Sequence, residues 1–201
     1  MIVVNLMVHP FGRFAQPFGG RIVGILSIIM LFFAFLGLSG CSDETVEPVR
    51  EGKLLLGTTI QVVLYEDPPD GIYERVFDRV QEIEQRMSTS TDDYDTTELL
   101  EVNRNAGVRP VAVSADTFEV VEEALEYSRL TEGAFDLTIY PLVDLWGIGT
   151  ADAAVPSEEA VAERLELVDY RKVELNPEEQ TIYLPEDGMG IDVGAIAKGY
   201  A

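Results

Sequence analysis

The sequence has few of the side chains on which nucleophilic and metal chemistry usually depend. Its 201 residues include one cysteine, Cys41, and one histidine, His9. A single cysteine excludes an internal disulfide and any metal site built from several cysteines. Because His9 lies in a segment that we expect to be removed, the mature chain would have neither a Ser-His-Asp triad nor a histidine-bound zinc ion.

Basic charge is also scarce, since 14 basic residues stand against 36 acidic ones and the formal net charge is −22. The first forty residues contain Arg13 and Arg21 but no acid, so without them 12 basic residues remain and the net charge is −24. A chain this acidic repels nucleic acid, and no nucleic-acid partner is expected. A phosphate-bearing ligand would need local N–H groups and a divalent cation to overcome this field.

The N-terminal segment has the pattern of an export signal. Arg13 and Arg21 precede an uncharged run over residues 22–38, and small residues follow before Cys41. A basic region, an apolar core and small residues at the cut are typical of a secretory signal peptide. The sequence Leu-Ser-Gly-Cys resembles a bacterial lipobox, in which Cys41 becomes lipidated.

We therefore expect a lipoprotein signal peptide over residues 1–40, a tether over residues 41–50, and a domain over residues 51–201. The domain would be lipid-anchored in a bacterial cell envelope, facing the periplasm or the outside. An uncleaved transmembrane anchor is the alternative, because a run of 17 uncharged residues is near the lower length for spanning a bilayer.

Hydrophobic patterns in the domain predict an α+β fold, with an antiparallel sheet and packed helices. β-Branched and apolar residues predict a strand over residues 53–65, with Gly57 at a bulge or a close approach. A 3.6-residue period and capping residues predict four helices. These are a helix to Met87 capped by Asp70, one to Arg104 capped by Asp95, one to Arg129 capped by Ser114, and one from Ser157 that ends before Tyr170. A β-hairpin is expected over residues 171–176 and 181–185.

Between the third and fourth helices, residues 131–147 combine apolar and polar side chains. We expect an extended segment that Pro141 stops, followed by one helical turn ending at Gly147. Asp136 inside this segment would be either paired with the protein or facing a ligand, because buried polar groups need partners. Trp146 is expected in the core, with a stacking platform as the alternative.

The last eleven residues, 191–201, predict a short buried strand that breaks at Gly194 and continues as a small-residue helix. Free N–H groups at a helix N-terminus can bind a phosphate when no side chain blocks its approach. Lys198 lies one turn further on and could reach the same phosphate. Asp192 could accept from a hydroxyl or a ring N–H of the ligand. A plain strand-to-helix turn in a core is the alternative.

Several motifs occur together in a specific order. They are Met87-Ser-Thr, Gly133-Ala-Phe-Asp-Leu-Thr, Pro141-Leu-Val-Asp-Leu-Trp-Gly147 and Asp192-Val-Gly-Ala-Ile-Ala-Lys-Gly-Tyr200. With the lipobox before them, these motifs resemble the FAD:protein FMN transferase family, also called ApbE, over about residues 51–201. The resemblance implies cleavage of FAD at its pyrophosphate and transfer of FMN to a threonine of an acceptor protein, with Mg²⁺ required and AMP released. The acceptor would belong to a membrane redox complex or be an exported flavoprotein.

The resemblance also implies site residues, although it names no general base. FAD contacts are expected from Leu56, Ala134, Phe135, Asp136, Asp192 and Lys198. The backbone carbonyl of Ala195 is expected to bind Mg²⁺, which prefers oxygen ligands.

The sequence departs from the family pattern in two places. Family members commonly have Met-Ser-Thr-Tyr, whereas this chain has Ser90 at the fourth position and Tyr94 four residues later. Tyr94 would then supply the aromatic contact from a shifted position, or the contact is missing. The chain also stops at Ala201, so residues 51–201 are expected to be the N-terminal part of the flavin transferase domain, with the fold truncated. The alternatives are an FAD-binding or FAD-hydrolysing lipoprotein, or an inactive truncated fragment.

Overall fold

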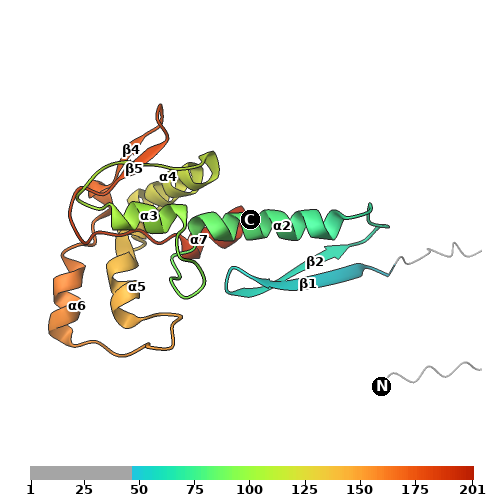
Figure 1. Ribbon diagram of the computed structural model, residues 1–201, viewed down its shortest axis with the longest axis horizontal. Helices are drawn as coiled ribbons and strands as arrows, with labels where there is room; N and C mark the ends of the chain where they lie inside the picture. Colours follow the sequence, from blue (N-terminus) through green and yellow to red (C-terminus); the bar gives the residue numbers. More distant parts are fainter. Residues whose placement is uncertain (1–46) are drawn as a thin grey trace, which may run out of the picture. The chain divides into compact units, whose positions relative to one another are not determined.

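The computed structural model describes residues 47–201, in which helices pack against antiparallel β-sheets (Figure 1). The expected α+β fold is confirmed. The predicted signal peptide, the lipidated Cys41 and most of the predicted tether lie outside the described residues. Within residues 47–201, no helix has both the length and the apolar character needed to cross a bilayer.

The first sheet is a hairpin of β1 (Val49–Leu55) and β2 (Thr58–Leu64). Leu56 and Gly57 form its turn with φ angles of 51° and 64°. Two successive left-handed residues suit the twist of a two-residue hairpin, although Asn, Asp or Gly usually occupies the first position. The prediction of one strand over residues 53–65 is therefore wrong, because Gly57 completes a turn. Strand β1 also begins inside the range predicted as a tether.

Helix α2 (Ile72–Met87) covers this hairpin, and its bounds agree with the sequence prediction. Tyr73, Phe77 and Val80 form a small apolar cluster with Leu55 from β1. The Tyr73 hydroxyl also donates to the carbonyl of Val49 at 2.9 Å. The predicted Asp70 cap is wrong, since the helix begins after the left-handed Gly71 and no side chain caps it.

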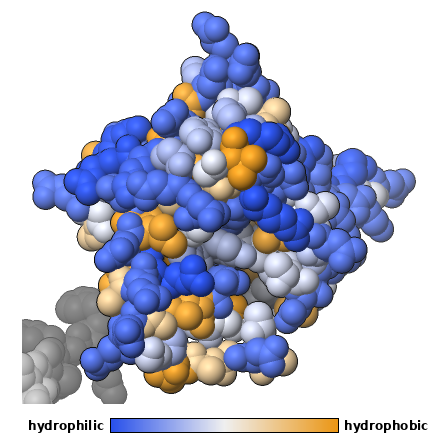
Figure 2. All heavy atoms as spheres, turned by 60° about the vertical axis from the view of Figure 1, so that its left-hand side comes forward, coloured by the Kyte–Doolittle hydropathy of each residue, from blue (hydrophilic) through white to orange (hydrophobic). Residues whose placement is uncertain are grey.

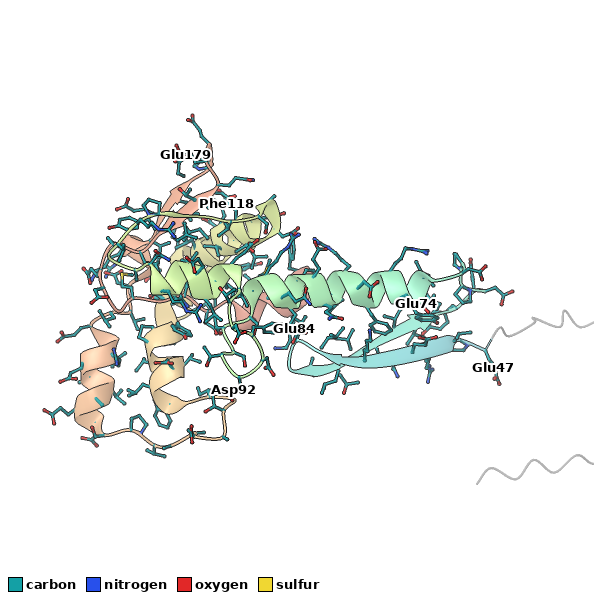
Figure 3. The ribbon with its side chains drawn as sticks, in the orientation of Figure 1. Glu47, Glu74, Glu84, Asp92, Phe118 and Glu179 are labelled. Carbon is teal, nitrogen blue, oxygen red and sulfur yellow. The ribbon has the colours of Figure 1, made fainter. Side chains whose placement is uncertain are left out.

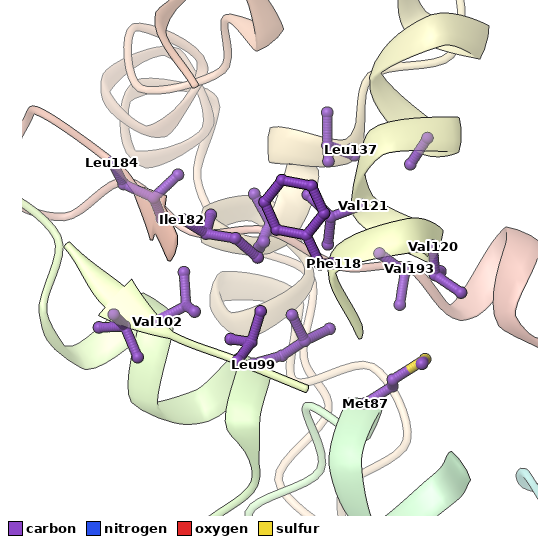
Figure 4. Close-up of a cluster of buried hydrophobic side chains, with 14 of the residues drawn as sticks. Met87, Leu99, Val102, Phe118, Val120, Val121, Leu137, Ile182, Leu184 and Val193 are labelled. Carbon is purple, nitrogen blue, oxygen red and sulfur yellow. The ribbon is translucent and has the colours of Figure 1, made fainter. Parts of the chain in front are cut away.

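A larger core lies under α3 (Glu98–Arg104), α4 (Ala115–Leu130) and a three-stranded sheet. The sheet consists of β3 (Val111–Ala112), β4 (Glu174–Asn176) and β5 (Thr181–Tyr183) in the order β3-β5-β4. Figure 4 shows Phe118 and Val121 of α4 among side chains from α3 and β5. The predicted hairpin before residue 185 is confirmed as the β4–β5 pair.

Helix caps in this part agree with the sequence in two cases out of three. Ser114 and Ser157 accept from the backbone N–H groups of Thr117 and Ala160, as predicted. Helix α3 is capped by Thr97, which accepts from Leu100 at 3.0 Å, and not by Asp95. Both Asp95 and Thr97 are good capping residues, so the local sequence alone did not separate them.

The remaining helices are η1 (Leu137–Ile139), α5 (Tyr140–Trp146), α6 (Glu158–Leu165), η2 (Tyr170–Lys172) and α7 (Gly194–Tyr200). Pro141 lies in the first turn of α5, where its missing N–H has no helical partner to lose. The extended segment predicted before Pro141 is therefore wrong, whereas the helical turn predicted to end at Gly147 is confirmed as part of α5, which Gly147 caps. Trp146 is 38% exposed at the end of α5, so its predicted place in the core is also wrong.

The strand predicted at residues 191–193 is absent, although its backbone is well bonded. The side-chain amide of Asn103 on α3 accepts from the N–H of Ile191 at 2.8 Å and donates to the Ile191 carbonyl at 3.0 Å. The N–H of Asp192 donates to the Leu137 carbonyl at 2.8 Å. An amide side chain thus takes the place of a neighbouring strand and fixes the segment that leads into α7.

A charged cluster joins α2, α4 and α7 around Asp116. Arg79 donates to both Asp116 oxygens, at 2.9 and 2.6 Å, and Arg86 donates to one of them. The Tyr200 hydroxyl donates to the other oxygen at 2.7 Å. Hydrogen bonds from Arg79 and Tyr200 lower the pKa of Asp116 to about 2, while the bond to Asp116 raises the pKa of Tyr200 to about 12.

This cluster should make the stability of the protein depend on acid pH. A carboxylate with a lowered pKa stabilises the fold fully above its ordinary pKa, and the contribution is lost as the pH falls through the folded-state value. Asp116→Asn should therefore lower the free energy of unfolding by about 1–2 kcal/mol at neutral pH, after allowance for solvent screening. Urea unfolding should show the difference from wild type shrinking between about pH 4 and pH 2. A difference that does not change with pH would contradict this assignment.

Candidate functional site

A cavity of 480 Å³ opens between the turn of the β1–β2 hairpin, the end of α2, the loop after it, α5 and α7. This volume is in the range of small-molecule sites, about 300–1,000 Å³. It is lined by Leu56, Gly57, Glu84, Met87, Ser88, Thr89, Ser90, Thr91, Asp93, Tyr140, Val143, Asp144, Gly147, Ile148, Gly149, Thr150, Asp192, Gly194, Ala197 and Lys198.

Three helices present one face each to the cavity. On every one of them the lining residues are spaced by three and four positions, which places them on the same side of a helix. The lining residues are Glu84, Met87 and Ser88 at the end of α2; Tyr140, Val143, Asp144 and the cap Gly147 on α5; and Gly194, Ala197 and Lys198 on α7. These three helices therefore set the positions of half of the lining residues.

Glu84 holds the hairpin turn beside the cavity. Its carboxylate accepts from the backbone N–H of Leu56 at 3.0 Å, and Figure 3 shows Glu84 next to the turn. The Tyr94 phenol lies close to the same carboxylate, and burial, then the charge of Glu84, raise the pKa of Tyr94. The Glu84 carboxylate therefore links α2 to the hairpin turn, and its charge acts on Tyr94 in the loop that follows α2.

Asp192 is fixed by two donors at the start of α7. Its carboxylate accepts from the Thr89 hydroxyl at 2.6 Å and from the N–H of Gly194 at 2.8 Å. The carboxylate thus takes one of the N–H groups that the sequence suggested for a phosphate. Each carboxylate oxygen has a second lone pair, so Asp192 can still accept a hydrogen bond from a ligand in the cavity.

Lys198 is the one basic side chain among the lining residues of the described chain, whereas Glu84, Asp93, Asp144 and Asp192 are acidic. Within residues 47–201, Lys198 has no carboxylate within ion-pair distance. Its ammonium can therefore donate to an anionic ligand without first breaking an ion pair. The surrounding carboxylates would oppose a diphosphate unless a cation accompanied it.

Tyr140 gives the cavity an aromatic wall at the start of α5. Burial, then the Asp144 carboxylate, raise the pKa of Tyr140, so its phenol stays neutral and can donate a hydrogen bond. Its ring lies against Gly190, where a Cβ atom would be only 2.4 Å from Cδ1 of Tyr140. The ring and the segment before Asp192 therefore fit together only because residue 190 has no side chain.

The structure brings together three of the residues expected to contact FAD, namely Leu56, Asp192 and Lys198. Ala134, Phe135 and Asp136 do not line the cavity. Asp136 is paired with the protein: its carboxylate accepts from the N–H and hydroxyl of Thr138, at 2.8 and 2.6 Å, and from the N–H of Tyr170 at 3.1 Å. Of the two alternatives predicted for Asp136, pairing with the protein or facing a ligand, the structure shows pairing with the protein.

The loop after α2 contains Ser90, which stands where the family motif commonly has an aromatic residue, and Tyr94, which could supply the aromatic contact instead. Ser90 lines the cavity, and its hydroxyl donates to Asp93 at 2.8 Å. Tyr94 is not among the lining residues. In this structure the aromatic surface of the cavity comes from Tyr140 instead.

A magnesium site is not complete in the described part of the chain. Ala195 is exposed on α7 and does not line the cavity, although its neighbours Gly194 and Ala197 do. Among residues 47–201, no group of three or more acidic, histidine or cysteine side chains is arranged to hold a metal ion. The side chains of this part therefore do not complete a Mg²⁺ site, and a site that used the Ala195 carbonyl would need further oxygen ligands from elsewhere.

Glu84 and the α5 face were not predicted from the sequence as parts of the site. The spacing of Tyr140, Val143, Asp144 and Gly147 was a usable signal, but it defines one face only when all four residues belong to the same helix, and the helical turn was predicted only after Pro141. No local signal marked Glu84, because its partner Leu56 is 28 residues away in the sequence.

Comparison with known proteins identifies the family. The model of the ApbE family matches residues 56–201, so the chain belongs to the ApbE family. An FAD:protein FMN transferase of Treponema pallidum is 32% identical over 188 residues, covering 89% of this chain and 50% of that protein. One from Klebsiella pneumoniae is 33% identical over 147 residues, covering 73% and 45%. The chain thus spans about half the length of these curated relatives.

Solved structures agree with this assignment. The ApbE protein of Thermotoga maritima superposes with a TM-score of 0.70 at 26% identity, covering 77% of this chain and 50% of that one. The flavin transferase ApbE of Vibrio cholerae superposes with a TM-score of 0.65 at 30% identity, covering 77% and 50%. These likenesses confirm the fold expected from the motifs.

Proposed function

We propose that the protein acts as an FAD:protein FMN transferase, which moves FMN from FAD to a threonine of an acceptor protein and releases AMP. The observation that carries the proposal is the convergence of Leu56, Asp192 and Lys198, from distant parts of the sequence, on one cavity. The names of the curated relatives support the same activity.

The groups that line the cavity suit recognition of a flavin nucleotide. Lys198 would donate to a phosphate oxygen, and Asp192 would accept from a hydroxyl or a ring N–H of the ligand. Tyr140 offers an aromatic face for the ring system and a neutral hydroxyl that can donate. Positioning and charge neutralisation are the main requirements of phosphoryl transfer.

In the proposed reaction the threonine hydroxyl oxygen attacks the phosphorus atom of the FMN half of FAD. The new oxygen–phosphorus bond replaces the bridging bond of the pyrophosphate, and AMP leaves with the bridging oxygen. The hydroxyl proton passes to a base that we do not assign to any described residue. Water in place of threonine would give FMN and AMP, which is hydrolysis of FAD.

Dependence on Mg²⁺ is part of the same proposal. The carboxylates around Lys198 give a physical reason for it, because a divalent cation would offset their repulsion of a diphosphate. The Ala195 carbonyl would supply one oxygen ligand. The others would have to come from the diphosphate, from water, or from residues outside the described part of the chain.

Covalent labelling of an acceptor tests this function. The intact protein, FAD, Mg²⁺ and a threonine-bearing acceptor domain should yield an acceptor that stays fluorescent under ultraviolet light after denaturing electrophoresis, with AMP formed in equal amount. Replacement of the acceptor threonine by valine should abolish the label. Formation of FMN and AMP without labelling would instead support an FAD hydrolase, and stable binding of unchanged FAD would support a binding protein.

We also propose that Cys41 carries a lipid and anchors the protein in a bacterial cell envelope, facing the periplasm or the outside. The lipobox-like sequence and the run of uncharged residues before it support this location. The membrane would then hold the enzyme near an acceptor in a membrane redox complex or near an exported flavoprotein. Cys41→Ser should move most of the protein from the membrane fraction to the soluble fraction and abolish incorporation of labelled fatty acid. Unchanged membrane association with no label in wild type would instead favour a transmembrane anchor.

A further inference from the structure

Helix α7 carries Lys198, and both of its ends are tied to other elements. At the N-terminal end, Asp192 is bonded to Thr89, and Ile191 is bonded to Asn103. At the C-terminal end, the Tyr200 hydroxyl donates to Asp116 at 2.7 Å. Asp192 and Thr89 line the cavity described above, whereas Tyr200 does not.

Asp116 is a rigid acceptor for this tyrosine. Its side chain is only 18% exposed and lies in the first turn of α4, where the helix dipole favours a negative charge. Arg79 and Arg86, both on α2, also donate to it. Because α2 and α4 both pack in the apolar cores, Asp116 provides a fixed point against which α7 is held.

The spacing between Tyr200 and Lys198 makes this contact relevant to the site. Two residues along an α-helix differ by about 200° around its axis, so the two side chains leave α7 on nearly opposite sides. Tyr200 therefore points to α2 and α4, whereas Lys198 lines the cavity. A rotation of α7 that turned Lys198 away from the cavity would also separate Tyr200 from Asp116.

We propose that Tyr200 is a positioning residue of the flavin site: its hydrogen bond to Asp116 fixes the rotation of α7 and thereby directs Lys198 at the phosphate of the ligand. Tyr200 itself does not touch the ligand. This inference rests on the proposed function, in which Lys198 contacts a phosphate of FAD.

Affinity measurements on two ligands test the inference. FAD contains the diphosphate, whereas riboflavin has the same ring system and no phosphate, and quenching of flavin fluorescence gives Kd for both. Tyr200→Phe removes only the hydroxyl group and should raise Kd for FAD by about three- to tenfold, the equivalent of one hydrogen bond. Kd for riboflavin should stay the same. Tyr127→Phe is the matched control, since Tyr127 is exposed on α4, and it should change neither value.

A double-mutant cycle separates positioning from a general loss of structure. If Tyr200 acts through Lys198, Tyr200→Phe should have no further effect on Kd for FAD in a Lys198→Ala background. An equal effect in both backgrounds, or equal weakening of FAD and riboflavin, would overturn the inference while leaving the proposed function intact. If Lys198→Ala does not weaken FAD binding, or wild type does not bind FAD, the proposed contact fails and the inference fails with it.

Discussion

Gly190→Ala should destabilise the protein strongly and distort the cavity. An alanine Cβ would lie 2.4 Å from Cδ1 of Tyr140, closer than atoms can approach, and 3.1 Å from its Cβ and Cγ, which is a tight contact. Two of these atoms are near the tyrosine backbone, so the ring cannot simply rotate away. Overpacking of this kind costs about 1–3 kcal/mol, and we expect the upper part of that range in urea unfolding. FAD affinity should fall as well, because Tyr140 lines the cavity and Asp192 is two residues from the substitution.

Two variants show whether the clash is the cause. Gly199→Ala is the matched control, since its Cβ would meet no atom within 4 Å and alanine favours a helix. It should leave the stability unchanged or raise it by up to about 1 kcal/mol. Truncating the ring in a Gly190→Ala, Tyr140→Ala double variant should cost less than the two single changes added together. Additive costs would mean that Gly190 is needed for another reason.

Asp192→Ala should weaken FAD binding by about one to two orders of magnitude, the usual value of a hydrogen bond to a charged group. Its stability should change much less, by about 1 kcal/mol or less, because Thr89 and Gly194 are not buried and water can replace the lost carboxylate. Flavin fluorescence titration and urea unfolding give the two quantities separately.

Asp152→Ala is the control for the loss of one negative charge, since Asp152 is exposed and does not line the cavity. It should leave Kd for FAD unchanged. If Asp192→Ala unfolds the protein while its residual folded fraction binds normally, Asp192 has a structural role only. Tighter binding would mean that the Asp192 carboxylate competes with a phosphate for the Gly194 N–H.

Features determined by local sequence were predictable, and features determined by distant contacts were not. Ser114 and Ser157 cap their own helices three residues on, so these helices could be located from the sequence. The backbone of Ile191 is bonded to Asn103, 88 residues earlier, and an apolar run therefore looked like a strand. The hairpin turn at Leu56 was not predicted because leucine rarely adopts the left-handed conformation that it has here.

In the candidate site, too, features determined by local sequence were predictable and features determined by distant contacts were not. Asp192 and Lys198 belong to one short motif, and the structure places both in the cavity. Asp136 belongs to another motif, but its carboxylate is bonded to Thr138 and to Tyr170, 34 residues away. Three of the four motif segments therefore contribute to the cavity, whereas the side chains that face it depended on helix faces that only the structure defines.

The most direct measurement is a crystal structure of the intact protein with bound FAD and Mg²⁺. The account predicts electron density for FAD in the cavity between the hairpin turn, α5 and α7, with a phosphate oxygen within hydrogen-bond distance of Lys198 and the ring system near Tyr140. FAD bound at another surface, or in this cavity with Lys198 directed to solvent and its phosphates held elsewhere, would contradict it.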